Sequence, residues 1–173
     1  MTGLPAEALV LRSELLRRVV SAKAGAKRRL PFRRRVMIPD LQSSLLCDDV
    51  RQERNGKFIL IGLFDILAVP GFPAIFQRIC VVTRWCCGEG EFQQHSRILK
   101  ADGNTVLVEG KEVKIKLPDS EATATSVEFF LNVKFETPGT YWVEILLDGD
   151  LKLRHPLKAR IVKSREPRQK DTA

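Results

Sequence analysis

Alternation of apolar and polar residues is strongest near the end of the chain, where it predicts antiparallel strands. Between positions 127 and 135 almost every second residue is apolar, with Phe130 as the exception; the set is Val127, Phe129, Leu131, Val133 and Phe135. A period of two with one apolar face indicates a half-buried strand. The alternation resumes over residues 141–147 and 151–161, and the turn sequences Pro138-Gly139 and Asp148-Gly149 separate the three segments. We therefore expect three consecutive antiparallel strands.

The apolar faces of the last two strands agree only when odd positions pair with odd positions. A two-residue loop at Asp148-Gly149 would pair Ile145 with Lys152, and so set an apolar side chain against a cation. We therefore expect a three-residue loop, at residues 147–149 or 148–150, closed by a glycine bulge.

The outward row of the last strand is the strongest surface feature and consists of four cations: Lys152, Arg154, Lys158 and Arg160. In the expected register Glu144 lies near Lys152 or Arg154, and Trp142 lies near Arg154 or Pro156. Pro156 cannot donate a ladder hydrogen bond, so we expect this strand to lie at an edge or to be bulged there. The row has two interpretations: charge that protects an edge against unwanted pairing, or a docking strip for an acidic protein partner.

The globular pattern begins at Met37 and predicts further strands upstream. We expect strands over residues 41–51 and 58–69, joined by the hairpin signal Asn55-Gly56. Residues 58–69 are almost continuously apolar, which predicts a central, largely buried strand with Gly62 marking a bulge. Further strands are expected over residues 74–87, 91–100 and 105–117. Seven to nine strands with turn signals at fairly regular spacing predict an all-β sandwich or barrel.

Two stretches of the sequence resemble known proteins. Phe135-Glu136-Thr137-Pro138-Gly139-Thr140-Tyr141-Trp142-Val143-Glu144-Ile145, closed by Leu147-Asp148-Gly149, resembles the last two strands of immunoglobulin-like bacterial sandwiches. Ser44-Leu45-Leu46-Cys47-Asp48-Asp49-Val50-Arg51, followed by Asn55-Gly56-Lys57 and Leu60-Ile61-Gly62-Leu63-Phe64, is similar to the opening of a bacterial family of unknown function. The resemblance covers the body from about Met37 to Val162. Together the resemblances imply an all-β, immunoglobulin-like antiparallel β-sandwich of seven to nine strands, which is the fold we expect. They imply neither an activity nor any site residue.

Charge divides the chain into three parts. Residues 1–36 hold ten Lys or Arg and two Glu, which accounts for the whole formal net charge of +8. Residues 37–162 hold 15 basic and 17 acidic side chains, and residues 163–173 hold four basic and two acidic ones. We therefore expect a basic, partly helical or disordered N-terminal extension at 1–36, a β-sandwich domain at 37–162 and a disordered C-terminal tail at 163–173. The basic character belongs to the extension, which argues against nucleic-acid binding by the folded body.

The extension ends in a basic run around Pro31, formed by Lys27, Arg28, Arg29, Arg33, Arg34 and Arg35. Four interpretations stay open. The extension is a poorly ordered or non-native segment, with Met37 as the natural start; it is an arm that contacts nucleic-acid phosphates; it is an amphipathic helix on an anionic membrane; or it is an organelle-targeting peptide, which Glu7 and Glu14 disfavour.

Cysteine usage predicts a reducing compartment. Cys47, Cys80, Cys86 and Cys87 lie in or beside strand-like segments, with neither a disulfide spacing nor a secretory signal in the sequence. We expect them to be small buried hydrophobes in a cytoplasmic protein. Together with His95 they lack the Cys-x-x-Cys spacing of structural zinc, so we predict no metal site. No run of about 18 apolar residues predicts a membrane-spanning helix.

Catalytic equipment is not recognisable in the sequence. A glycine-rich phosphate loop, a Gly-x-Ser-x-Gly elbow and a His-Glu-x-x-His motif are all missing. Asp48, Asp49 and Asp65 would gather if the first two strands pair, but they supply too few oxygen ligands for calcium or magnesium. We expect His155 to be a hydrogen-bonded histidine of the core or rim. The sequence predicts no catalytic residue and no cofactor.

These patterns favour a non-enzymatic interaction or structural module that binds a protein partner through a sheet edge or through loops. One alternative is an accessory protein that binds nucleic acid through the N-terminal arm. A second alternative is a small-molecule or carbohydrate binder on an aromatic sheet face around Trp85 or Trp142, against which buried tryptophans would argue. The sequence names neither the partner nor the oligomeric state.

Overall fold

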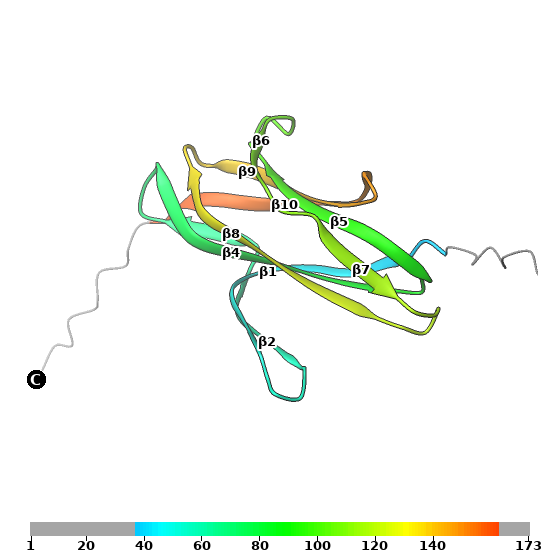
Figure 1. Ribbon diagram of the computed structural model, residues 1–173. Coiled ribbons are helices and arrows are strands. Elements are labelled where there is room, and N and C mark those ends of the chain that lie inside the picture. Colours follow the sequence, from blue (N-terminus) through cyan, green and yellow to red (C-terminus); the bar gives the residue numbers. More distant parts are fainter. Residues whose placement is uncertain (1–36, 163–173) are drawn as a thin grey trace, which may run out of the picture. The chain divides into compact units, whose positions relative to one another are not determined.

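The computed structural model describes residues 37–162, which form an all-β body of two packed sheets (Figure 1). Within this range no segment is helical, and the strands are β1 (Asp40–Gln52), β2 (Phe58–Phe64), β3 (Ile66–Val69), β4 (Ala74–Cys86), β5 (Gly90–Leu99), β6 (Val106–Glu109), β7 (Val113–Leu117), β8 (Ala124–Phe135), β9 (Gly139–Leu147) and β10 (Asp150–Ile161). The prediction of an all-β sandwich is confirmed. Among the described residues no helix is long and apolar enough to cross a membrane.

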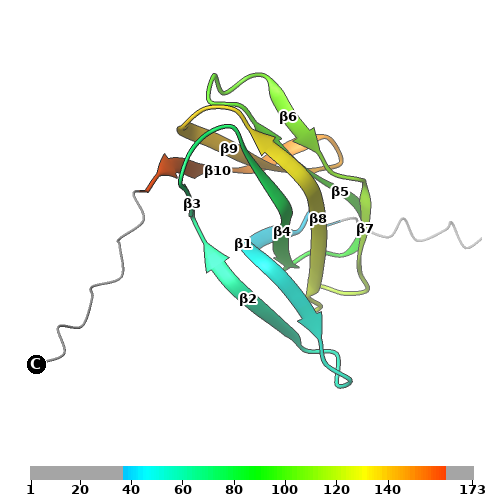
Figure 2. The ribbon, with the colours of Figure 1, turned by 90° about the vertical axis from the view of Figure 1, so that its left-hand side faces the viewer.

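The two sheets have different strand orders. One sheet has four strands in the order β2-β1-β4-β8, and the other has the order β3-β10-β9-β5-β6, with β7 also paired to β5. Figure 2 shows the β1–β2 hairpin at the margin of the first sheet. All strand pairs are antiparallel except β3 and β10, which run parallel from Ile66 opposite Lys158 to Val69 opposite Ile161. The segment that leaves the first sheet therefore pairs, as β3, with β10 of the second sheet.

The apolar run at residues 58–69 does not form the single buried strand that its composition predicts. It divides at Asp65 into β2 and β3, which belong to different sheets. β2 is an edge strand whose exposed apolar side chains are Phe58, Ile59, Ile61 and Leu63. A continuous apolar run does not distinguish burial on both faces from exposure at a sheet edge, which explains the error. The division also brings the number of strands to ten, above the expected seven to nine.

The inner face of β8 changes partway along the strand. Its buried residues are first even and then odd: Ser126, Glu128 and Phe130, followed by Val133 and Phe135. Asn132, between the two sets, has a positive φ of 53°. The expectation that Phe129 and Leu131 share the inner face was therefore wrong, and both are exposed. Phe130, the exception in the sequence pattern, is in fact a core residue.

The β9–β10 hairpin combines the loop that the sequence argument rejected with the register that it favoured. Leu147 pairs with Asp150 across a two-residue turn, in which Asp148 and Gly149 both have positive φ. A bulge between Leu151 and Leu153 then shifts the ladder, so that odd positions pair with odd positions beyond it. Two further pairs follow the predicted register: Glu144 lies opposite Arg154, and Trp142 opposite Pro156.

The core lies between the two sheets, and a tyrosine fixes the turn that enters β9. The largest fully buried side chains include Trp85, Phe135 and Leu157. The Tyr141 ring stands edge-on to that of Phe135, with the centroids 4.7 Å apart. Its hydroxyl donates a 2.8 Å hydrogen bond to the backbone carbonyl of Thr137. The turn at Pro138 is therefore tied to the core through the tyrosine that follows it.

Candidate functional site

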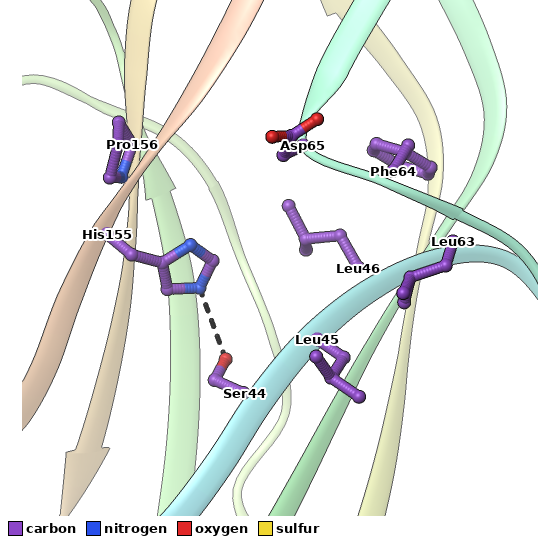
Figure 3. A pocket seen from close by; sticks show the side chains of 8 residues that line it. All are labelled: Ser44, Leu45, Leu46, Leu63, Phe64, Asp65, His155 and Pro156. Atoms are coloured by element: carbon purple, nitrogen blue, oxygen red, sulfur yellow. Dashed lines mark hydrogen bonds between the residues drawn. The ribbon is translucent and has the colours of Figure 1, made fainter.

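A cavity of about 300 Å³ opens where three strands from the two sheets converge (Figure 3). Its lining comes from β1, from the end of β2 with the adjoining Asp65, and from β10: Ser44, Leu45, Leu46, Leu63, Phe64, Asp65, His155 and Pro156. Its volume lies at the lower end of the range for small-molecule pockets.

The crossing of the chain from β2 to β3 creates this cavity. The last β1–β2 pair is Leu46 with Phe64, so the β1 residues before Leu46 have no β2 neighbour. β3 pairs with β10 only from Lys158 onward, so His155 and Pro156 lack a strand on that side as well. The two uncovered strand margins face each other beside the crossing, and their side chains line the opening (Figure 3).

One polar contact spans the cavity. Ser44 Oγ lies 3.2 Å from His155 Nε2, which joins β1 to β10 across the two sheets. Burial lowers the pKa of His155 below its ordinary value, and a hydrogen bond with the backbone of Pro156 opposes this effect. The imidazole is therefore neutral at pH 7 and offers one donor and one acceptor nitrogen. The placement agrees with the prediction of a hydrogen-bonded rim histidine.

A serine beside a neutral histidine resembles the nucleophile and general base of a catalytic triad, but the third member of a triad is missing among the described residues. Figure 3 places Asp65 on the β2 wall, away from the contact between Ser44 and His155. Within residues 37–162 no hydrogen bond joins Asp65 to the imidazole, so the third, orienting group of a triad is missing. The geometry suits binding of a small, mostly apolar molecule with one hydrogen-bonding group.

Sequence reasoning missed Ser44, because a single serine in a strand carries no signal of its partner. It also missed a buried polar network between the sheets. Gln94 accepts hydrogen bonds from Thr83 Oγ1 and Trp85 Nε1 and donates one to Glu128 Oε1, which also accepts from Ser96 Oγ. Glu128 Oε2 is buried and has no partner among the described residues. The sequence did contain a signal of this network: Ser126 and Glu128 are polar residues at even positions of β8, next to apolar ones.

The four cations of the predicted docking strip lie on β10, where Lys152 and Arg154 precede the stretch paired with β3 and so border a margin that no described strand covers. β10 stands between β3 and β9, and β3 covers the stretch that contains Lys158 and Arg160. Half-buried Lys152 lies 3.7 Å from the exposed carboxylate of Asp150, which makes a weak ion pair. Lys158 and Arg160 form no ion pair within the described range and border an open hollow with Pro138.

Arg154 serves the fold through three contacts on the outer face of the second sheet. Its guanidinium lies 4.7 Å from the Trp142 ring centroid and donates a 2.9 Å hydrogen bond to Gly103 O. It also lies 3.6 Å from the buried carboxylate of Glu144, which accepts a 2.7 Å bond from Arg97. These contacts neutralise Glu144 and cover Trp142. The predicted nucleic-acid arm (Lys27, Arg28, Arg29, Arg33, Arg34 and Arg35) lies outside the described residues.

The cysteines fall into two groups. Cys47 and Cys80 are fully buried partners across β1 and β4, in a small cluster with Val82 that is separate from the main core. Burial raises the pKa of Cys80 to about 11 and also raises that of Cys47, so neither thiol is a ready nucleophile. Cys86 is half-buried and Cys87 exposed, so the expectation that all four are buried was wrong.

The other proposed metal-ligating groups have separate surroundings. His95 Nε2 lies 2.9 Å from Glu109, and Asp49 pairs with Arg78 at 2.6 Å. Asp48 stands opposite Gly62 in the β1–β2 register, so the predicted proximity of Asp48 to Asp65 was wrong. In the part of the chain that the structure describes, no three His, Cys, Asp or Glu side chains gather where they could hold a metal ion.

Comparison with known proteins places the body in a family. A model described as a family of unknown function (DUF6941) matches residues 42–160, from within β1 to near the end of β10. The chain belongs to this family. No curated protein matches the DUF6941 chain. The prediction of an uncharacterised family is thereby confirmed, and the matched range includes both walls of the cavity.

Proposed function

We propose that this DUF6941 protein is a non-enzymatic binding module that takes up a protein partner by strand addition at β2. The edge of β2 that faces away from β1 has no strand beside it within the described body. An extended segment that adds to such an edge forms main-chain hydrogen bonds, and the exposed side chains give specificity.

The observation that carries the proposal is the chemistry of this edge. β2 contains neither a charge nor a proline from Phe58 to Phe64, and Leu63 is 62% exposed. Sheet edges in monomeric proteins are commonly blunted by lysine, proline or a covering loop. Here the cations Lys158 and Arg160 lie on a stretch that β3 covers, whereas the apolar and uncharged strand lies at the margin.

The test places a photo-cross-linking amino acid at Ile61 and, as a matched control, at Ile75, which is an exposed isoleucine in β4 of the same sheet. We expect the probe at position 61 to yield one discrete protein adduct in cells, and the probe at 75 to yield none. Adding Ile59→Lys should abolish the adduct, because a lysine on an edge opposes pairing. Equal adducts from both positions, or persistence in the lysine variant, would rule out strand addition at β2.

A second candidate function rests on the cavity at Ser44 and His155, which supports binding of a small molecule. The aromatic sheet face considered from the sequence is less suitable, because Trp85 is fully buried and Arg154 covers Trp142. Fragment screening by NMR would test the cavity. Shifts confined to residues around His155, and absent in His155→Leu, would support it, whereas no shifts there would exclude it.

Three further inferences concern the setting of the protein. We infer a cytoplasmic location, supported by four free cysteines. A relation to immunoglobulin-like sandwiches is supported by the hydrogen bond from Tyr141 to Thr137. A bacterial origin and the nucleic-acid role of the N-terminal arm stay predictions from the sequence.

A further inference from the structure

We infer that the partner of β2 is β2 of a second copy of this chain, paired antiparallel about a two-fold axis at Ile61. This inference rests on the proposed strand addition at β2 and names its occupant. Three features of the described residues carry it: the symmetry of the β2 sequence, the charges that flank it and the continuity of its ladder with β1.

The sequence of β2, Phe-Ile-Leu-Ile-Gly-Leu-Phe, is nearly a palindrome. In an antiparallel pair centred on Ile61, Phe58 of one copy lies opposite Phe64 of the other, and Ile59 lies opposite Leu63. Leu60 then lies opposite Gly62, and Ile61 opposite Ile61. Every large apolar side chain except Leu60 thus meets another of similar size, and Leu60 meets the residue with no side chain. Such cross-strand apolar pairs are the main stabilising unit of a sheet.

The same register aligns opposite charges at both ends. Lys57 directly precedes β2 and Asp65 directly follows it, so Lys57 of each copy lies opposite Asp65 of the other. Both side chains are exposed, and within residues 37–162 neither forms an ion pair. A parallel arrangement would place lysine beside lysine and aspartate beside aspartate. The charges therefore favour the antiparallel, two-fold pairing.

The β1–β2 ladder keeps one register from Gln52 opposite Phe58 to Leu46 opposite Phe64. Gly62 has a positive φ of +67°, and the pairs on either side of it keep the same register, so no extra residue is inserted into β2. Figure 2 shows this margin with no described strand beside it. Pairing two copies would join two four-stranded sheets into one continuous sheet.

Charge exchange provides the test, with the full chain and sedimentation equilibrium as the measurement. We expect the unmodified protein to dimerise reversibly. Lys57→Asp and Asp65→Lys should each weaken the dimer by roughly tenfold or more, because each change creates two like-charge contacts. The double variant K57D/D65K should restore the affinity. An equimolar mixture of the two single variants should form a heterodimer, since only the mixed pair aligns opposite charges at both ends.

The controls separate this inference from the proposed function. Thermal melts of the variants check folding, which both exposed positions should leave unchanged, and Lys158→Asp is a matched control that should leave the dimer intact. The inference is overturned if Lys57→Asp and Asp65→Lys do not weaken the dimer, or if mixing these two variants does not restore it. If the chain is a monomer while the probe at Ile61 captures a different polypeptide or residues 1–36 of its own chain, strand addition stands and self-pairing is wrong. If the probe captures nothing and the chain is a monomer, both fall.

Discussion

The carboxylate of Asp48 covers Gly62, its neighbour across the β1–β2 ladder. A Cβ added at Gly62 would overlap Asp48 Oδ2, and the glycine has a φ of +67°. The positive φ favours glycine at this position, and a side chain would also have to displace the Asp48 carboxylate. The ladder keeps its register across this point.

Gly62→Ala should destabilise the protein by about 1–3 kcal/mol through the strained φ and the displaced carboxylate. Urea denaturation followed by circular dichroism provides the measurement. Adding Asp48→Ala should recover the part of the loss that comes from the clash. Gly71→Ala is the control, because no atom lies within 4 Å of its added Cβ, and it should change stability by less than about 0.5 kcal/mol. A neutral Gly62→Ala would contradict the structure.

Glu128 accepts two hydrogen bonds in the buried network. Substituting it by Leu or by Gln should therefore change the unfolding free energy by very different amounts. Glu128→Leu removes the acceptor of Gln94 and Ser96 and should cost about 2–4 kcal/mol, because two buried donors lose their partner. Glu128→Gln keeps an acceptor oxygen and should change the unfolding free energy by less than about 1 kcal/mol. Equal effects of the two substitutions in denaturant titrations would show that the network does not act through this carboxylate.

The four thiols should react in two distinct phases. Cys87 is exposed and should alkylate first in the native protein at neutral pH, with half-buried Cys86 after it. Cys47 and Cys80 are buried, and burial raises the pKa of both, so they should react only after unfolding. Iodoacetamide labelling with peptide mass spectrometry provides the measurement. Labelling of Cys80 as fast as Cys87 would mean that the small cluster of Cys47, Cys80 and Val82 opens readily in the native protein.

His155 should make stability depend on pH. Its pKa in the folded state is lowered below the ordinary value of 6.5 by burial, so the unfolded chain binds the proton more readily. Stability from this residue is therefore fully present above pH 6.5 and is lost as the pH falls toward the folded-state pKa. Denaturation curves across this window should show a slope that His155→Gln reduces. If His155→Gln leaves this slope unchanged, a different titrating group causes the dependence of stability on pH.

The hairpins and the sandwich could be predicted from the sequence because alternation and turn residues act locally. The placement of Trp142 opposite Pro156 followed from matching apolar faces, and it was right although the loop length was wrong. The change of face at Asn132 was not predictable in the same way, since it depends on a single residue with positive φ. The clue was Phe130, whose break in the alternation marked the true inner face.

The candidate site depends on contacts between distant segments, and the sequence contains little of it. Ser44 meets His155 only because the chain leaves the first sheet at Asp65 and leaves two strand margins uncovered. Only the β2 part of the apolar run proved to be an exposed margin, whereas Leu67 and Val69 of β3 are buried. The pattern alone was interpreted as burial throughout, because periodicity does not tell an apolar edge strand from a central one.

The parallel pairing of β3 with β10 constrains when the protein can fold during its synthesis. Ile66 leaves the ribosome well before its neighbour Lys158. Until β10 emerges, β3 has no hydrogen-bonding neighbour in its sheet, and its apolar side chains Leu67 and Val69 lack the cover that they have in the folded body. Closure of the described body must therefore wait for β10, and such long-range pairing is slow. A nascent chain halted before β10 should depend on a chaperone for solubility.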